Sequence, residues 1–198
     1  MIERGTTLYG NVVRLEPLDF SHAGDLFENG NDPAIWEFTS GLHDMSSLDR
    51  VHHYIGRALY GDPLAPDSVP FAIVELATGR AIGSTRFHSI ETTHRKCEIG
   101  WTWLAPRFWR SAVNTECKVL LLSHAFECGA NRVQFKANAH NWRSRNAIER
   151  LGAQFEGTHR AFRIMDGKPT DVSFYSILAA EWPSIKERLS SVRVTVGA

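Results

Sequence analysis

The segment KCEIGWTWLAPRFWRSAVNTECKVLLLSHAFEC, residues 96–128, decides the fold of this chain. Its first part alternates as a strand does, and we expect a strand over 96–104. Apolar side chains then recur at helical spacing from Val113 through Cys117 and Leu121 to Cys128, which predicts a helix over about 112–128. A regular strand would place its side chains on alternate faces, with Glu98, Gly100 and Thr102 on one and Cys97, Ile99, Trp101 and Trp103 on the other.

The junction between this strand and this helix is suited to binding phosphate. Ser111 and Ala112 open the helix, and the first backbone N–H groups of a helix have no helical acceptor. The positive end of the helix dipole lies at the same place, beside Arg107 and Arg110. Without a ligand the same residues would form a helix N-cap with two solvated arginines, and the junction alone leaves both interpretations open.

The flanking segments supply the rest of one α/β domain, residues 1–198, with a mixed sheet. Before the junction, the patterns predict a strand over 8–18, helices near 19–29 and 47–60, and a hairpin of 69–76 with 80–90. After it, they predict a strand over 132–139, a helix over 141–152, a hairpin of 153–164 with 171–179, and a short helix from Pro183.

Composition and charge exclude several classes of protein. The chain has 22 Lys and Arg against 22 Asp and Glu, so it lacks the basic character of a nucleic-acid binder. It contains no P-loop, G-x-G-x-x-G or His-Glu-x-x-His motif, and its 9 His and 3 Cys show no local metal-binding spacing. A signal sequence and a membrane-spanning apolar stretch are both absent. We therefore expect a cytoplasmic protein with no metal and with neither nucleic acid nor membrane as a partner.

The order of these elements, with EIGWTWLAPRFWRSAVNTE, LLLSHAFE, RVQFKANAHNWRSRNAIERLGAQFEG and DVSFYSIL, resembles the GNAT superfamily of acetyl-CoA-dependent N-acetyltransferases. Within it the residues are similar to the branch of the ribosomal-protein alanine N-acetyltransferases, from Leu8 to Leu189. The resemblance implies a mostly antiparallel sheet of about seven strands with helices on both faces. It also implies that the fourth and fifth expected strands, 96–104 and 132–138, splay apart.

Acetyl-CoA is the co-substrate that the resemblance implies. In the family, this turn reads Gln/Arg-x-x-Gly-x-Gly/Ala. In this chain Arg107 and Ala112 match its first and last positions, and Arg110 takes the place of the middle glycine. The diphosphate would bind the N–H groups of residues 110–115, which are Arg110, Ser111, Ala112, Val113, Asn114 and Thr115. The pantetheine arm would pair with the backbone from Trp101 through Trp103 to Leu104, and Asn141 would contact its amides. Arg145, with Arg143, would either meet the adenosine 3′-phosphate or be solvated.

The resemblance also implies two catalytic residues. Glu98 corresponds to the family's glutamate base and would take the proton of the acceptor amine through a water; otherwise it is a carboxylate paired with Arg86 or another neighbouring-strand arginine. Ser144 corresponds to the serine of the N-x-x-S helix and would protonate the leaving thiolate; otherwise Asn141 is only a helix cap and Ser144 has no special role. Tyr175 is a second candidate acid, or a half-buried strand aromatic.

The loop of residues 30–46 is the expected acceptor site. Trp36, Glu37 and Phe38, with Asp32 and Asp44 nearby, suit an ammonium group, although tryptophans also pack in cores. The acceptor would be a protein N-terminus or a small amine that attacks the thioester directly, with Cys97 and Cys117 as core residues and no acyl-enzyme. The alternative is a non-catalytic module that binds acyl-CoA as a regulatory ligand. The exposed last hairpin could pair two chains into a homodimer.

Overall fold

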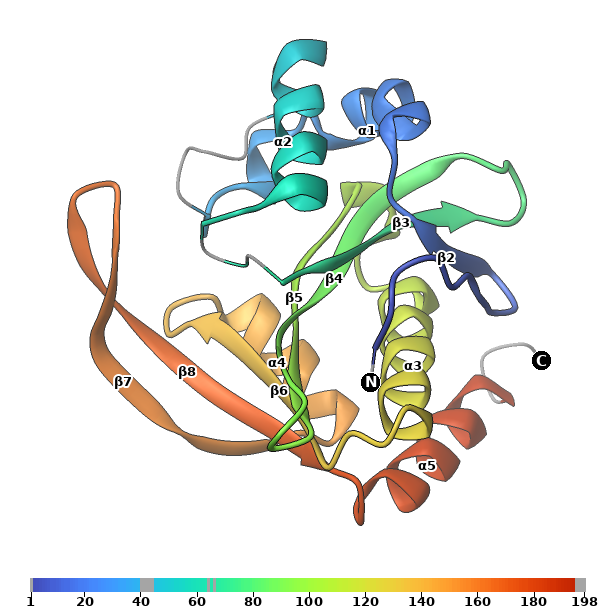
Figure 1. Cartoon of the computed structure of the whole chain (residues 1–198), viewed down its shortest axis with the longest axis vertical. Coiled ribbons are helices and arrows are strands. Elements are labelled where there is room, and N and C mark those ends of the chain that lie inside the picture. The colour runs from blue at the N-terminus through green and yellow to red at the C-terminus, as the bar shows by residue number, and fades with distance from the viewer. Residues whose placement is uncertain (1, 40–44, 64, 66, 195–198) are drawn as a thin grey trace.

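One mixed sheet runs through the computed structural model, which describes residues 2–39, 45–63, 65 and 67–194 (Figure 1). The strands, in spatial order, are β1 (Leu8–Tyr9), β2 (Val13–Pro17), β3 (Val69–Glu75), β4 (Ala81–Glu91), β5 (Lys96–Leu104), β6 (Arg132–Asn138), β8 (Lys168–Leu178) and β7 (Gln154–Met165). Among the neighbouring strand pairs of the described residues, only β5 and β6 run parallel, and the other pairs are antiparallel. The expected mostly antiparallel mixed sheet is confirmed.

The prediction of a single first strand over 8–18 is wrong, because two short strands and a turn occupy this segment. The N–H of Gly10 donates to the carbonyl of Val13 at 2.9 Å, and the carboxylate of Glu116 accepts the N–H groups of Asn11, Val12 and Val13. A Cβ at position 10 would lie 2.6 Å from the Glu116 Cδ, so only glycine allows this approach. The turn adds an eighth strand to the sheet.

Helices cover both faces of the sheet, as expected. The helices are α1 (Ala23–Gly30), α2 (Leu48–Tyr60), α3 (Ala112–Glu127), α4 (Trp142–Leu151) and α5 (Trp182–Val194). On one face α3, α4 and α5 pack in the main core through residues such as Leu121, Ile148 and Ile185, and on the other α1 and α2 pack around Leu26 and Ile55. The last helix is longer than predicted, with 13 residues. Among the described residues, no helix is both long enough and apolar enough to cross a bilayer.

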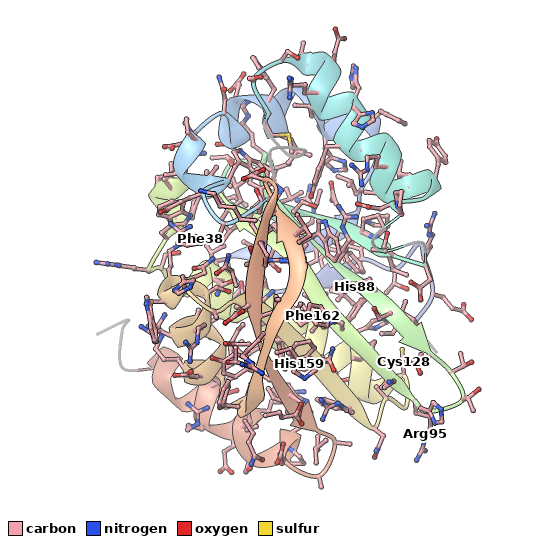
Figure 2. The ribbon with its side chains drawn as sticks, turned by 90° about the vertical axis from the view of Figure 1, so that its left-hand side faces the viewer. Phe38, His88, Arg95, Cys128, His159 and Phe162 are labelled. Carbon is pink, nitrogen blue, oxygen red and sulfur yellow. The ribbon has the colours of Figure 1, made fainter. Side chains whose placement is uncertain are left out.

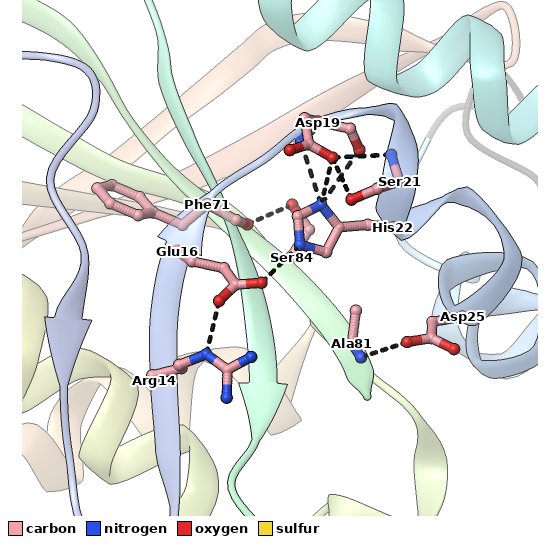
Figure 3. A network of polar contacts seen from close by, with 9 residues as sticks. All are labelled: Arg14, Glu16, Asp19, Ser21, His22, Asp25, Phe71, Ala81 and Ser84. Carbon is pink, nitrogen blue, oxygen red and sulfur yellow. Dashed lines mark hydrogen bonds and ion pairs between the residues drawn. The ribbon is translucent and has the colours of Figure 1, made fainter. Parts of the chain in front are cut away.

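A polar network fixes the first helix to the sheet (Figure 3). Glu16 of β2 accepts from the guanidinium of Arg14 at 2.6 Å and lies 2.9 Å from the Nε2 of the buried His22. Burial raises the pKa of Glu16, but Arg14 and His22 outweigh it and hold that pKa below its ordinary value. Asp25 of α1 accepts the N–H of Ala81 at 2.9 Å. The α1–α2 face is thereby held against β4, the strand next to the candidate site.

Candidate active site

The sheet opens between β5 and β6 (Figure 1). Their pairing consists of Lys96 with Arg132, Cys97 with Val133 and Glu98 with Gln134, and it ends there. Beyond Glu98, this edge of β5 meets no strand of the described chain, while β6 continues beside β8 to Asn138. The splay implied for these two strands is confirmed. It leaves open to an extended ligand those backbone groups of β5 after Glu98 that face away from β4, apart from the Leu104 carbonyl, which already accepts from the Trp109 indole at 2.9 Å. The Trp103 carbonyl instead points toward Gly83 of β4.

A β-bulge in β5 lies beside this opening. Two residues of β5, Trp101 and Thr102, stand opposite Thr85 of β4. Trp101 has a φ of 49°, a left-handed conformation that costs a bulky residue about 1–3 kcal/mol. Gly83 of β4 makes room for the bulge, since a Cβ there would lie 2.2 Å from the Trp103 carbonyl oxygen. Strain of this kind persists where the surrounding structure fixes it, often at functional sites.

The bulge makes the predicted facing of β5 wrong in its second half. The Trp101 ring lies 4.6 Å from the ring of His88, whose Nε2 is 3.3 Å from the Glu98 carboxylate. Trp103 packs among the side chains of α1 and α2. Thr102 instead turns toward α3 on the opposite face, where it accepts from the ammonium of Lys118. One extra residue reverses the alternation of side chains, so both tryptophans share the face of Glu98.

Helix α3 begins next to the opening. Ser111 is its N-cap, and the Ser111 Oγ accepts the N–H of Val113 at 3.3 Å. Helical geometry leaves the N–H groups of Ala112 and Asn114 without a helical acceptor, whereas that of Thr115 belongs to the first regular turn. The amides suited to an anion are therefore fewer than the expected set over 110–115, and they lie in the first turn.

Arg110 has a backbone conformation that glycine adopts without strain. Its φ is 60°, in the left-handed region, at a cost to a non-glycine residue of about 1–2 kcal/mol. The chain therefore follows the course that a glycine allows, and the exposed side chain adds a cation beside the start of α3. Arg107 lies in the same turn, with its guanidinium 4.7 Å from the ring centroid of Phe108.

Glu98 is a buried carboxylate where the pairing of β5 with β6 ends, with 4% of its surface exposed. Its Oε2 lies 2.7 Å from the ammonium of Lys136 and accepts from Gln134 at 3.0 Å, and its Oε1 lies 3.3 Å from His88 Nε2. Burial raises the pKa of Glu98, but the hydrogen bond and charge of His88 and the ammonium of Lys136 outweigh it, so that pKa lies below its ordinary value. Glu98 is ionised at neutral pH.

The β7–β8 hairpin covers this carboxylate. Figure 2 shows the hairpin, with His159 and Phe162, on the side of the sheet where His88 lies. The ammonium of Lys136 is 5.7 Å from the ring centroid of Phe162 and 5.3 Å from that of Phe174. The hairpin thus places two aromatic rings beside the lysine that pairs with Glu98.

The alternative of a paired Glu98 carboxylate is right in kind, since Lys136 of the neighbouring strand pairs with it, but the expected partner Arg86 is wrong. Arg86 is fully buried, its Nη1 lies 3.5 Å from Asp62, and its guanidinium sits between the rings of Trp101 and Tyr54 at 5.1 and 5.5 Å. The bulge moves Trp101 onto this face, where its ring lies against the guanidinium. Glu98 takes its partners from β6 and from His88 instead.

Ser144 and Asn141 lie together at the start of α4. Asn141 is the N-cap of this helix, and its Oδ1 accepts the Ser144 N–H at 2.9 Å. The Ser144 hydroxyl has no hydrogen-bond partner in the described part of the chain, so it is available to a ligand. Tyr175 is less suited to act as an acid. It is fully buried, donates to Glu149 and accepts from Arg145, and burial raises its pKa.

Arg143 and Arg145 of α4 both contact protein groups, although Arg143 is also exposed to solvent. Arg143 stacks on the Trp109 ring at 3.9 Å and donates to the Ala34 carbonyl at 3.4 Å. Arg145 donates to the Tyr175 hydroxyl at 2.9 Å and to the Ala139 carbonyl at 3.1 Å. The role predicted for Arg145 at the 3′-phosphate stays a prediction.

The predicted acceptor loop borders a cavity of about 230 Å³. Trp36, Glu37 and Asp32 line it together with Met45, whereas Phe38 is half-buried outside this lining. The centroid of the Trp36 ring lies 5.3 Å from that of Trp103, so a residue that lines the cavity contacts the bulged strand. Asp44 lies outside the described residues.

Cys97 and Cys117 are core residues, as predicted. Cys97 and Cys117 are both buried, and burial raises the pKa of Cys97 to about 12. A thiol of this kind is a poor nucleophile. In the described ranges, no group of three or more His, Cys, Asp or Glu is placed to hold a metal.

Sequence reasoning missed Lys136, His88 and Lys118. Lys136 and His88 reach Glu98 from strands on either side of β5, so only the strand pairing reveals them. Lys118 did leave a signal, because it is a charged residue within the most apolar helix.

Comparison with known proteins agrees with this site. Residues 13–154 match the model of the acetyltransferase (GNAT) domain. The N-acetyltransferase YoaA of Bacillus subtilis is 28% identical over 70% of this chain and 77% of its own. A second protein of that species, named "Putative ribosomal N-acetyltransferase YdaF", is 34% identical over 56% of this chain and 61% of its own. The crystal structure of a GCN5-related N-acetyltransferase from Brucella melitensis superimposes with a TM-score of 0.87 at 27% identity, over 96% of this chain and 86% of that one.

The fold and the opened sheet thus define an acyltransferase. The chain belongs to the GNAT family of acetyltransferases, whose donor is acetyl-CoA.

Proposed function

We propose that the protein moves the acetyl group of acetyl-CoA to a primary amine by direct attack on the thioester. The observation that carries the proposal is the end of β5–β6 pairing at Glu98 and Gln134, beside the first turn of α3. The residues present fit the donor: the edge of β5 suits an amide-bearing arm, and the amides of Ala112 and Asn114 suit a diphosphate. Acetyl-CoA supplies an acetyl group activated as a thioester.

Glu98 would accept the proton that the acceptor must lose. An alkyl ammonium has a pKa near 10, so a base is needed at neutral pH. Glu98 is ionised and lies where the pairing of the two strands ends, although its burial calls for a water to carry the proton. The Ser144 hydroxyl would donate to the leaving sulfur, and the Nδ2 of Asn141 would bind the arm. A backbone N–H on the open edge of β5, next to the bulge, would face the developing negative oxygen.

The acceptor amine would enter by the cavity that Trp36 and Glu37 line. An aromatic wall with carboxylates favours an ammonium group. The name of the relative YdaF, "Putative ribosomal N-acetyltransferase", supports a ribosomal acceptor, and the volume of about 230 Å³ also suits a small amine.

Thiol release from acetyl-CoA, measured with a disulfide reagent across a panel of peptides and small amines, tests this proposal. We expect release that depends on the amine and saturates with it. Binding of acetyl-CoA without turnover on any amine would favour the regulatory module instead. Arg110, the residue that keeps this alternative open, has a φ of 60°, which a glycine adopts without strain.

A further inference from the structure

Lys118 is a buried ammonium that the proposed chemistry does not use. It lies on α3 with 6% of its surface exposed, and its Nζ donates to the Thr102 Oγ1 at 2.5 Å. The hydroxyls of Thr102 and Thr85 are 2.7 Å apart, so the three side chains form one chain of contacts from helix to sheet. The titratable group that acts electrostatically on Lys118 is the thiol of Cys117. No carboxylate of the described residues contacts the Lys118 Nζ.

The place where Lys118 attaches is the bulge itself. Trp101 and Thr102 share one partner on β4, so one of them lacks a regular place in the ladder of backbone hydrogen bonds. The side chain of Thr102 is held from two sides instead, by Thr85 within the sheet and by Lys118 from α3. These two contacts keep the Thr102 side chain on the α3 face. They therefore maintain the changed alternation of side chains that brings Trp101 and Trp103 to the face of Glu98.

Packing alone does not explain a lysine at this position. Burial lowers the pKa of Lys118 to about 8, which means that the fold disfavours its charged form. A methionine would fill a similar volume without that penalty. Burial thus disfavours the charge of the side chain that holds the strained strand beside the opening.

We infer that Lys118 is a positioning residue, which fixes the bulge through Thr102 and so sets the course of β5 along the opening between β5 and β6. The inference rests on the proposed function for its catalytic consequence. A shift of the backbone by about 1 Å at a reacting group lowers a rate by roughly 10²-fold.

The variants Lys118→Met and Thr102→Val test this role, with Thr102→Ser as the conservative replacement that keeps the hydroxyl. We expect Lys118→Met and Thr102→Val to lower kcat for thiol release by roughly 10²-fold, with the KM for acetyl-CoA changed by less than about threefold. Thr102→Ser, which keeps the hydroxyl, should retain most of the wild-type kcat. The urea midpoint of Lys118→Met should equal or exceed that of the wild type, because an uncompensated buried charge is removed.

Amide hydrogen exchange at residues 101–103 gives a readout that does not depend on activity. We expect exchange of the Trp103 N–H to become faster by roughly tenfold or more in both variants. Wild-type kcat and wild-type exchange in a folded Lys118→Met or Thr102→Val protein would overturn the inference. If Lys118→Met does not fold, Thr102→Val decides alone. If the wild type releases no thiol with any amine, the proposed function fails, and the exchange rates still decide the role of Lys118.

Discussion

Replacing Ala112 by proline removes one amide from the start of α3 and leaves the rest of the helix intact. Proline is tolerated at the first position of a helix, where its missing N–H has no helical acceptor. The residue before a proline must be extended, and Ser111 already has φ −98° and ψ 177°. Stability should therefore change by less than about 1 kcal/mol.

The effect on the donor should be much larger. A hydrogen bond from an amide to a charged phosphate contributes about 1.5–3 kcal/mol, which corresponds to roughly a ten- to 150-fold weaker Kd for coenzyme A. Isothermal calorimetry measures Kd, and urea unfolding measures stability. Leu48→Pro is a matched control, since Leu48 is the first residue of α2 after the extended Ser47 and lies away from the site. Coenzyme A binding to Ala112→Pro that equals the wild type would refute the role of these amides.

Three further changes test other parts of the site. Glu98→Gln should lower kcat by roughly 10²-fold. Because the pKa of Glu98 lies below 4.5 in the fold, its charge should stabilise the wild type above pH 4.5, and this stabilisation should be lost as the pH falls further. An equal pH dependence of unfolding in the wild type and in Glu98→Gln would contradict this. Ser144→Ala should lower kcat by roughly tenfold or more with stability within about 0.5 kcal/mol, and an unchanged rate would remove the proton donor. Gly83→Ala should destabilise the fold by about 2 kcal/mol or more in urea, because its Cβ would meet the Trp103 carbonyl at 2.2 Å, and a wild-type midpoint would show that the bulge can relax.

The sequence predicted the elements whose patterns are long. The helix over 112–128 became α3, and the hairpins and the strand over 96–104 were found at nearly their predicted bounds. A helix or strand with one apolar face imposes its period over many residues, and this period is legible without tertiary contacts. The junction at Ser111 followed from the same patterns.

The bulge and the partners of Glu98 were beyond the sequence for a physical reason. The run Trp101, Thr102, Trp103 fits a strand whichever face of the sheet the tryptophans occupy, so the sequence pattern does not reveal the inserted residue. Lys136 reaches Glu98 only because β6 pairs in parallel with β5 at Gln134. Such contacts depend on strand register, which side chains far apart in the chain determine together.

A crystal structure with bound coenzyme A tests the central claim most directly. We predict that the diphosphate lies on the first-turn amides of α3 and that the arm runs along the open edge of β5, with its sulfur between β5 and β6 near Ser144. Coenzyme A found elsewhere on the molecule, with this edge of β5 left free, would contradict the account.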